Sequence, residues 1–327
     1  MDKYTTALVT GGAGFIGSHI AEYLYRQKMK VIIVDNLMRG KVENISHLLD
    51  EGIEFVKMDV RNYDVIKDHF KGVDLVFHFA AMVGVKFATK RPLEVMDSNI
   101  GGLRSALKAS VKGKVKKFVF ASSSEVYGDI EVVPMREDLP LSPISPYGIS
   151  KIVGEAYCKA FSQKYGLNTS IVRYFNVYGP RQSSEDKSWV IPTFLTNAIE
   201  DKPLVIHGSG SQTRDFTFVS DAIEGTMLIA KGGEGMTESY NIGSGKETSI
   251  NALAELVLML SESKKDIIHT RRRAFHIKRR CADISKAKER LGYRPKVNLK
   301  DGLGMTWDYF VRQKKNTSPR GTCHNTT

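Results

Sequence analysis

The most reactive arrangement in this sequence is a tyrosine and a lysine four residues apart, Tyr147 and Lys151. A tyrosine phenol has a pKa of about 10 and is a poor base at neutral pH, but a neighbouring ammonium group stabilises the phenolate. Residues four apart on a helix share one face, and Pro146 suits the first turn of a helix. The pair could therefore exchange a proton with a substrate hydroxyl. The alternative is an amphipathic helix with two exposed polar residues.

A run of three serines, residues 122–124, precedes this pair and follows an apolar stretch, 117–121, that predicts a strand. At the end of that strand, Ser123 could hydrogen-bond both a substrate hydroxyl and the Tyr147 phenol. Ser123 therefore joins Tyr147 and Lys151 as a candidate catalytic residue.

Three glycines, Gly11, Gly14 and Gly17, lie where a predicted strand, 7–10, must turn into a predicted helix, 15–28. Gly11 permits the tight turn, Gly14 lets the backbone approach a pyrophosphate, and Gly17 lets helix and strand pack closely. The helix N-terminus offers N–H groups and a positive dipole to phosphates. The spacing predicts a dinucleotide site, against the alternative of a structural turn. Two more cofactor contacts are predicted inside this segment, at Phe15 and Ile16.

Asp35 ends a second predicted strand, 30–35, where a carboxylate can accept hydrogen bonds from both hydroxyls of an adenosine ribose. It would repel a 2′-phosphate, so we predict NAD rather than NADP, although Arg39 is close by. Asp59 follows a third strand, 53–57, and could bond the adenine amino group or instead cap the next helix. Further cofactor contacts are predicted at Asn36, Val60, Phe79, Ala80 and Ala81.

These residues need a scaffold that brings strand ends together. Continuous apolar strands separated by helices are typical of a parallel sheet covered on both faces, and right-handed crossovers then give an α/β, doubly wound, Rossmann-type sheet. After residue 179 the pattern is less regular. We predict a dinucleotide-binding domain at 1–179, a smaller, mixed α/β C-terminal lobe at 180–315 that mainly binds substrate, and a polar tail at 316–327.

The composition excludes several classes of protein. The chain has 327 residues, 42% of them hydrophobic and 26% charged, as in soluble globular proteins. No apolar run approaches the roughly 20 residues of a membrane span, and the sequence enters a strand almost at once, without a signal peptide. The three cysteines have neither metal nor disulfide spacing. We therefore expect a cytoplasmic protein that holds no metal and does not bind membranes.

The net charge of +12 is concentrated between residues 264 and 296. Such a run is usually a solvated surface, and nucleic-acid binding is a second reading. Aromatic residues are not interleaved as a stacking platform would require, so we predict no nucleic-acid partner. Some of these arginines would instead hold a diphosphate, for which the guanidinium fork is well shaped.

The combination resembles the extended short-chain dehydrogenase/reductase family, specifically its NAD-dependent nucleotide-sugar epimerases and dehydratases, of which the UDP-glucose 4-epimerases are most similar. The resemblance runs from about residue 8 to residue 307. It is carried by 10–17 (TGGAGFIG), 122–128 (SSSEVYG), 145–151 (SPYGISK), 173–181 (RYFNVYGPR), 212–216 (QTRDF), 219–221 (VSD), 240–244 (YNIGS) and 282–286 (ADISK).

The resemblance implies roles for further residues. Ser123, Tyr147 and Lys151 would be the catalytic trio, and Asn99 and Tyr174 would lie near the cofactor. Asn176 would bond the diphosphate of a UDP-sugar substrate, and Arg214 and Arg273 would clamp it, although either arginine could equally form a surface ion pair. Further substrate contacts are implied at Ser123, Ser124, Val190, Val205 and Arg280.

Members of this family share a first step, in which the sugar 4-hydroxyl is oxidised to a 4-keto group. They differ in the steps that follow. We expect a 4-epimerase, which needs no further acid. The alternatives are a 4,6-dehydratase or a uronate decarboxylase using Glu125, with Arg280 placed where a decarboxylase would bind the sugar carboxylate. Typical dehydratases have Asp-Glu where this chain has Ser124-Glu125, and His276 stands where epimerases usually have aspartate. A dinucleotide-binding protein without catalysis is less favoured, since all three catalytic residues are present.

The family also implies an assembly. Predicted helices at 93–110 and 147–164 carry apolar stripes, and the equivalent helices of relatives form a four-helix dimer interface. We therefore expect a homodimer. The alternative is that both stripes only cover the sheet.

Overall fold

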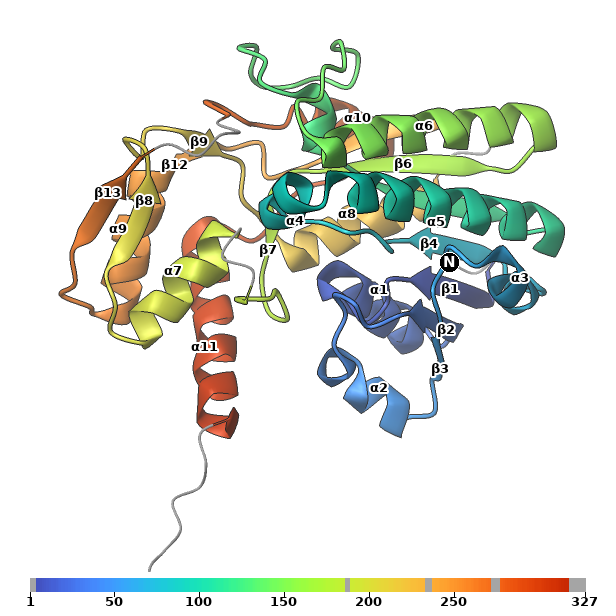
Figure 1. Cartoon of the computed structure of the whole chain (residues 1–327), viewed down its shortest axis with the longest axis horizontal. Coiled ribbons are helices and arrows are strands. Elements are labelled where there is room, and N and C mark those ends of the chain that lie inside the picture. The colour runs from blue at the N-terminus through green and yellow to red at the C-terminus, as the bar shows by residue number, and fades with distance from the viewer. Residues whose placement is uncertain (1–3, 186–188, 233–236, 272–276, 318–327) are drawn as a thin grey trace, which may run out of the picture.

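The chain folds around a seven-stranded parallel sheet that is covered by helices on both faces (Figure 1). This computed structural model describes residues 4–185, 189–232, 237–271 and 277–317. The strand order is β11-β6-β5-β4-β1-β2-β3, so the chain reverses direction across the sheet between β1 and β4. The predicted doubly wound α/β fold is confirmed. The strands are β1 (Thr6–Thr10), β2 (Lys30–Asp35), β3 (Glu54–Lys57), β4 (Leu75–His78), β5 (Lys117–Ser123), β6 (Thr169–Tyr174) and β11 (Glu238–Ile242).

Strand register brings the predicted site segments to one edge. Thr10 at the end of β1 is paired with Val34 of β2 and with His78 of β4. The glycine turn, Asp35 and the segment after β4 therefore emerge side by side at the carboxyl edge. Ligands of open α/β sheets bind there, where the strand order reverses.

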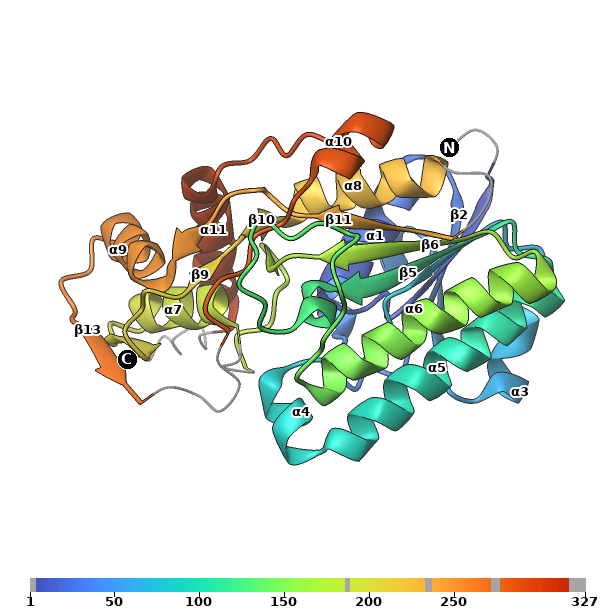
Figure 2. The ribbon, with the colours of Figure 1, turned by 90° about the horizontal axis from the view of Figure 1, so that it is seen from above.

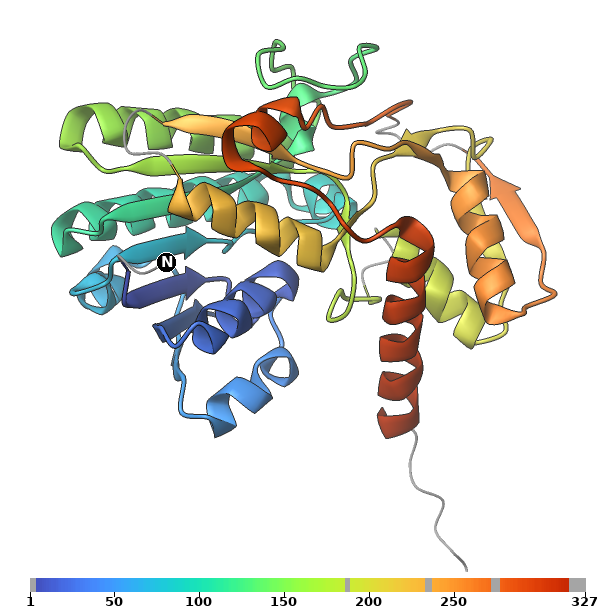
Figure 3. The same ribbon diagram turned by 180° about the vertical axis from the view of Figure 1, so that it is seen from behind.

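Two helical layers bury opposite faces of the sheet (Figures 2 and 3). Helices α1 (Phe15–Arg26) and α8 (Val219–Lys231) pack on one face, and α5 (Pro92–Gly113) and α6 (Pro146–Tyr165) on the other. Alternate residues of each strand point to opposite faces, and both faces are apolar, so two cores form. The short helices are η1 (Val42–Asn44), α2 (Ser46–Asp50), α3 (Tyr63–Ile66), η2 (Lys67–Phe70), α4 (Val85–Lys90), η3 (Ser124–Tyr127) and α10 (Ser285–Leu291).

A smaller group of elements lies beyond the carboxyl edge of the sheet (Figure 1). Its helices are α7 (Val190–Ile199), α9 (Ile250–Ser261) and α11 (Leu299–Thr317), which pack against one another. Short strands pair as β8 (Leu204–His207) with β13 (Ile267–Thr270), β9 (Thr213–Arg214) with β12 (Thr248–Ser249), and β7 (Val177–Tyr178) with β10 (Thr217–Phe218).

The chain crosses between the two groups of elements more than once. Strand β11 pairs with β6 in the main sheet, and α8 packs beneath that sheet, although both lie after residue 179. A division of the sequence at residue 179 therefore does not coincide with the spatial division. Within the described ranges, no helix is both long enough and apolar enough to cross a membrane.

Candidate active site

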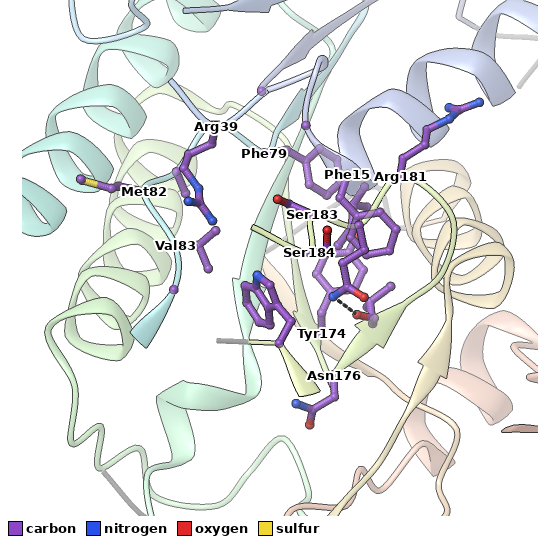
Figure 4. Close-up of a pocket in the computed structure, with 18 of the residues that line it drawn as sticks. Phe15, Arg39, Phe79, Met82, Val83, Tyr174, Asn176, Arg181, Ser183 and Ser184 are labelled. Carbon is purple, nitrogen blue, oxygen red and sulfur yellow. Dashed lines mark hydrogen bonds between the residues drawn. The ribbon is translucent and has the colours of Figure 1, made fainter. Parts of the chain in front are cut away.

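A cavity of about 1440 Å³ follows the carboxyl edge of the sheet and continues between the sheet and the smaller group of elements. Ligand pockets for one small molecule typically have volumes of about 300–1,000 Å³, so this cavity has room for a dinucleotide together with a second ligand. Figure 4 shows part of it, with Arg39 and Val83 on one wall and Phe15 and Phe79 on the other. Both the predicted cofactor segments and the predicted catalytic residues line it.

The glycine turn leaves no room for side chains. Gly11 has a φ of +69°, and a Cβ there would lie 2.5 Å from the backbone nitrogen of Ala80. A Cβ on Gly17 would lie 2.2 Å from the carbonyl oxygen of Gly11. Helix α1 starts directly after this turn, and the first N–H groups of a helix have no partner within it. The turn therefore has the shape and the dipole that suit a pyrophosphate.

Asp35 lies at the bottom of the cavity and is buried. Its two carboxylate oxygens accept hydrogen bonds from the backbone N–H groups of Ala13 (3.0 Å) and Leu37 (2.8 Å). Burial raises its pKa. Each carboxylate oxygen can accept more than one hydrogen bond, so both retain capacity for the hydroxyls of a ribose. These acceptor oxygens fit the unphosphorylated ribose of NAD.

Asp59 lines the same cavity and forms an ion pair with Arg61. Arg61 donates to it from Nε (3.0 Å) and Nη2 (2.7 Å), and Asn36 donates at 3.3 Å. The hydrogen bonds from Arg61 lower the pKa of Asp59. Helix α3 begins later, after Asn62, so Asp59 is not its capping residue. Contact between Asp59 and adenine stays a prediction.

The first turn of α6 presents Tyr147 and, one turn later, Lys151 to the cavity. Pro146 is the first helical residue, and the hydroxyl of Ser145 caps the helix by accepting from the N–H of Gly148 at 3.0 Å. The Lys151 ammonium lies 5.4 Å from the centre of the Tyr147 ring. The expected shared face is therefore observed.

The expected lowering of the Tyr147 pKa by Lys151 is not observed. Burial, together with the Glu125 carboxylate, raises the pKa of Tyr147, and a hydrogen bond with Ser123 opposes this rise. Lys151 instead donates to the carbonyl oxygen of Ala121 at 2.7 Å, and burial lowers its own pKa to about 7. The raised pKa of Tyr147 means that additional positive charge nearby would favour its phenolate form.

Glu125 lies beside the catalytic trio and is held in place. Its backbone N–H donates to the Ser123 hydroxyl at 3.2 Å, and its carboxylate accepts from the Ser145 hydroxyl at 2.6 Å. Because Ser145 also caps α6, Glu125 is linked to the start of the helix that carries Tyr147. Glu125 can therefore act as an acid or base in the cavity, as a support for α6, or as both.

Two arginines reach the cavity from the smaller group of elements. Arg214 donates from Nη1 to the carbonyl oxygens of Thr213 (2.7 Å) and Ile277 (3.0 Å), and burial lowers its pKa to about 10. Arg280 is 4% exposed and donates to the carbonyl oxygen of Gly128 at 3.2 Å, while its Nε is buried without a partner in the described parts of the chain. Neither forms an ion pair with another of the described residues, so both can meet an anionic ligand.

The remaining predicted residues divide into three groups. Asn99 does not line the cavity: its side chain bonds the backbone of Met82 and the hydroxyl of Ser150, so it supports the wall. Arg273 lies outside the described residues. The others all line the cavity, namely Gly14, Phe15, Ile16, Asn36, Val60, Phe79, Ala80, Ala81, Ser123, Ser124, Tyr174, Asn176, Val190 and Val205.

Two glutamines in the cavity were not predicted. The side-chain Oε1 atoms of Gln182 and Gln212 are buried and, among the described residues, have no hydrogen-bond partner. Their amide groups donate to the carbonyl oxygens of Val177 and His207. Gln212 begins the QTRDF stretch and Gln182 follows the stretch 173–181, which is the signal that could have identified them.

Comparisons with known proteins agree with this geometry. A family profile described as GDP-mannose 4,6 dehydratase matches residues 8–306. A putative UDP-glucose 4-epimerase of Methanocaldococcus jannaschii is 39% identical over 90% of this chain and 95% of its own length. A UDP-N-acetyl-alpha-D-glucosaminuronate decarboxylase of Bacillus cytotoxicus is 38% identical over 93% of this chain and 97% of its own.

Solved structures give the same result. The crystal structure of a UDP-glucuronic acid 4-epimerase from Bacillus cereus, in complex with UDP-glucuronic acid and NAD, superposes with a TM-score of 0.87. It is 33% identical and covers 94% of this chain and 100% of its own. The chain therefore belongs to the extended short-chain dehydrogenase/reductase family of NAD-dependent nucleotide-sugar epimerases and dehydratases.

Proposed function

We propose that this enzyme is a 4-epimerase that oxidises the C4 hydroxyl of a UDP-hexose and reduces the 4-keto sugar on its other face. The observation that carries the proposal is the position of Ser123, Tyr147 and Lys151 in one cavity with the glycine turn and Asp35. This arrangement supports a proton-transfer set next to a dinucleotide site. The glycine turn and Asp35 would hold NAD, whose nicotinamide would supply the acceptor and then the donor of the C4 hydride.

The side chains supply the proton transfer. Ser123 orients the sugar hydroxyl, and Tyr147 takes its proton while the C4–H bond breaks, so the C4–O bond becomes a carbonyl. Because burial and Glu125 raise the pKa of Tyr147, the phenolate needs the charge of protonated Lys151 and the positive charge of an oxidised nicotinamide. The phenolate form of Tyr147 is therefore most populated while positive charge from Lys151 and an oxidised nicotinamide is nearby.

The second half-reaction needs no additional group. Tyr147 returns its proton to the 4-keto oxygen after the sugar has turned its other face toward the cofactor. We propose that the smaller group of elements binds the UDP portion, with Asn176 and Arg214 on the diphosphate and Val190 and Val205 near the base. All four residues line the cavity.

A substrate panel tests this proposal. The purified protein is incubated with UDP- and dTDP-hexoses and with UDP-hexuronates, and the products are separated by chromatography. The proposal expects interconversion of the two C4 epimers of a UDP-sugar. Loss of carbon dioxide or of water from the substrate would contradict it.

A uronate decarboxylase is the second candidate, because of Glu125 and Arg280. The Arg280 side chain is buried in the cavity with an unpartnered Nε, and a buried cation of this kind suits a sugar carboxylate. Glu125 would then act after oxidation, a step that a 4-epimerase does not have. A 4,6-dehydratase would need Glu125 in the same way.

The variant Glu125→Gln separates these candidates, because its amide oxygen can still accept the hydrogen bond from Ser145. A 4-epimerase should lose little activity. A decarboxylase or dehydratase should lose about 100- to 10,000-fold, as expected for an acid–base group, and should accumulate reduced cofactor absorbing at roughly 340 nm. Ser145→Ala is the matched control: it keeps the carboxylate and removes its support, so it reports how much of any loss comes from positioning α6.

A further inference from the structure

A fully buried carboxylate, Asp215, follows Arg214 in the sequence and accepts a hydrogen bond from Ala282, in the segment that carries Arg280. Its Oδ1 accepts from the backbone N–H (2.7 Å) and hydroxyl (2.6 Å) of Ser244, and from the Thr217 hydroxyl at 3.4 Å. Its Oδ2 accepts from the backbone N–H groups of Gly245 (3.0 Å) and Ala282 (3.1 Å). One side chain thus joins three segments that are far apart in the sequence.

One of these segments carries Arg280. We call residues 277–282 the arginine strap. Its first part is held by β9: the N–H of Thr213 donates to the carbonyl oxygen of Lys278 at 3.0 Å, and Arg214 donates to that of Ile277 at 3.0 Å. Its last part is held by Asp215 through Ala282. Asp215 and Arg214 are sequence neighbours, so the same short stretch holds both ends of the strap.

The packing around this carboxylate leaves little freedom. A Cβ on Gly243 would lie 2.7 Å from the Asp215 Oδ2 and 2.5 Å from the Cβ of Ala282. Arg214 and Arg280 are close enough for their charges to interact, and this repulsion contributes to the low pKa of Arg214. Two like charges held together in a buried cavity need a rigid frame, because without it they would move apart.

We propose that Asp215 is a positioning residue that fixes Arg214 and the arginine strap in one geometry, so that the Arg214 guanidinium meets the diphosphate of the substrate with Arg280 held beside it. This inference rests on the proposed use of a nucleoside diphosphate sugar. Asp215 itself does not line the cavity. Its effect is on the phosphate contacts, and the hydrogen bonds it makes among the described residues involve neither the glycine turn nor Asp35.

The test compares the affinities of UDP and uridine for the full-length protein with its bound cofactor, by calorimetry and by ligand-observed NMR. In Asp215→Asn, the amide NH₂ meets backbone N–H donors, so the strap loses a support. We expect UDP to bind about ten- to a hundredfold more weakly, with uridine affinity and cofactor content unchanged. A general loosening of the fold would instead weaken the binding of uridine as much as the binding of UDP.

Two further variants complete the test. Asp221→Asn removes another buried carboxylate, which accepts from the N–H of Val297 and does not contact the strap, and it should leave UDP affinity unchanged. Ser244→Ala removes the 2.6 Å hydrogen bond to Asp215 together with two longer contacts to the backbone of Lys246 (3.3 and 3.5 Å). It leaves the carboxylate in place and should give a smaller loss of UDP affinity, so it tests the proposal even if Asp215→Asn does not fold. Unchanged UDP affinity in the folded variants, or an equal loss for uridine, would overturn the positioning role. Wild-type protein that binds no UDP would overturn the proposed function as well.

Discussion

Replacing Gly17 with alanine should empty the cofactor site. A Cβ at this position would lie 2.2 Å from the carbonyl oxygen of Gly11 and 2.9 Å from its carbon. Contacts with a real Cβ essentially never fall below 3.0 Å, so the turn and α1 must separate by at least about 0.8 Å. The obstructing atoms are backbone, and no side-chain rotation relieves the clash.

The magnitude follows from two opposing effects. Alanine is about 1 kcal/mol better than glycine within a helix, while overpacking of this kind typically costs about 1–3 kcal/mol. The net loss of stability is therefore modest. The displacement is instead concentrated in the turn that would hold the pyrophosphate. In an active site, a misplacement of about 1 Å can lower the reaction rate roughly 100-fold.

The assay is the amount of NAD and NADH released when the purified protein is denatured, together with the melting temperature. Gly304→Ala is the matched control: Gly304 lies in α11 with nothing within 4 Å of an added Cβ. It should raise the melting temperature slightly and leave cofactor content unchanged. Wild-type cofactor content in Gly17→Ala would refute the assignment of the glycine turn as the cradle.

Three further predictions concern the cofactor, the base and the assembly. Denatured wild-type protein should release NAD(H) in near-stoichiometric amount; release of NADP(H) would contradict the role of Asp35. Tyr147→Phe should lower turnover by about 100- to 10,000-fold, with cofactor content retained; appreciable turnover would exclude Tyr147 as the base. Helices α5 and α6 pack side by side and expose Leu93 and Ile149, so light scattering should give a dimer, and a monomeric mass would reject this interface.

Local chemistry explains which parts of the structure the sequence predicted. The second strand was predicted at its observed bounds, Lys30–Asp35, because its residues are continuously apolar and end at a carboxylate. The start of α6 was predicted because Pro146 suits the first turn of a helix. The glycine spacing predicted the turn into α1 because each glycine meets a separate backbone constraint.

Features that depend on distant parts of the chain were not predicted. Strand β11 joins the sheet beside β6, which lies more than 60 residues earlier, and no local pattern specifies such a partner. The sequence placed Arg280 near the sugar but did not indicate that it is buried. The pKa of Tyr147 was expected to fall because of Lys151, whereas burial and the Glu125 carboxylate raise it. Burial depends on the whole fold, so the spacing of Tyr147 and Lys151 in the sequence could not predict it.

The most direct test of the proposed chemistry follows a single hydrogen. A UDP-hexose with deuterium at C4 is converted by the purified protein, and the product is examined by NMR and mass spectrometry. If Tyr147 and the bound cofactor act on C4 as proposed, the product has the opposite configuration at C4 and keeps its deuterium at that carbon. Loss of deuterium to solvent, its transfer to C6, or a product with unchanged C4 configuration would contradict the account.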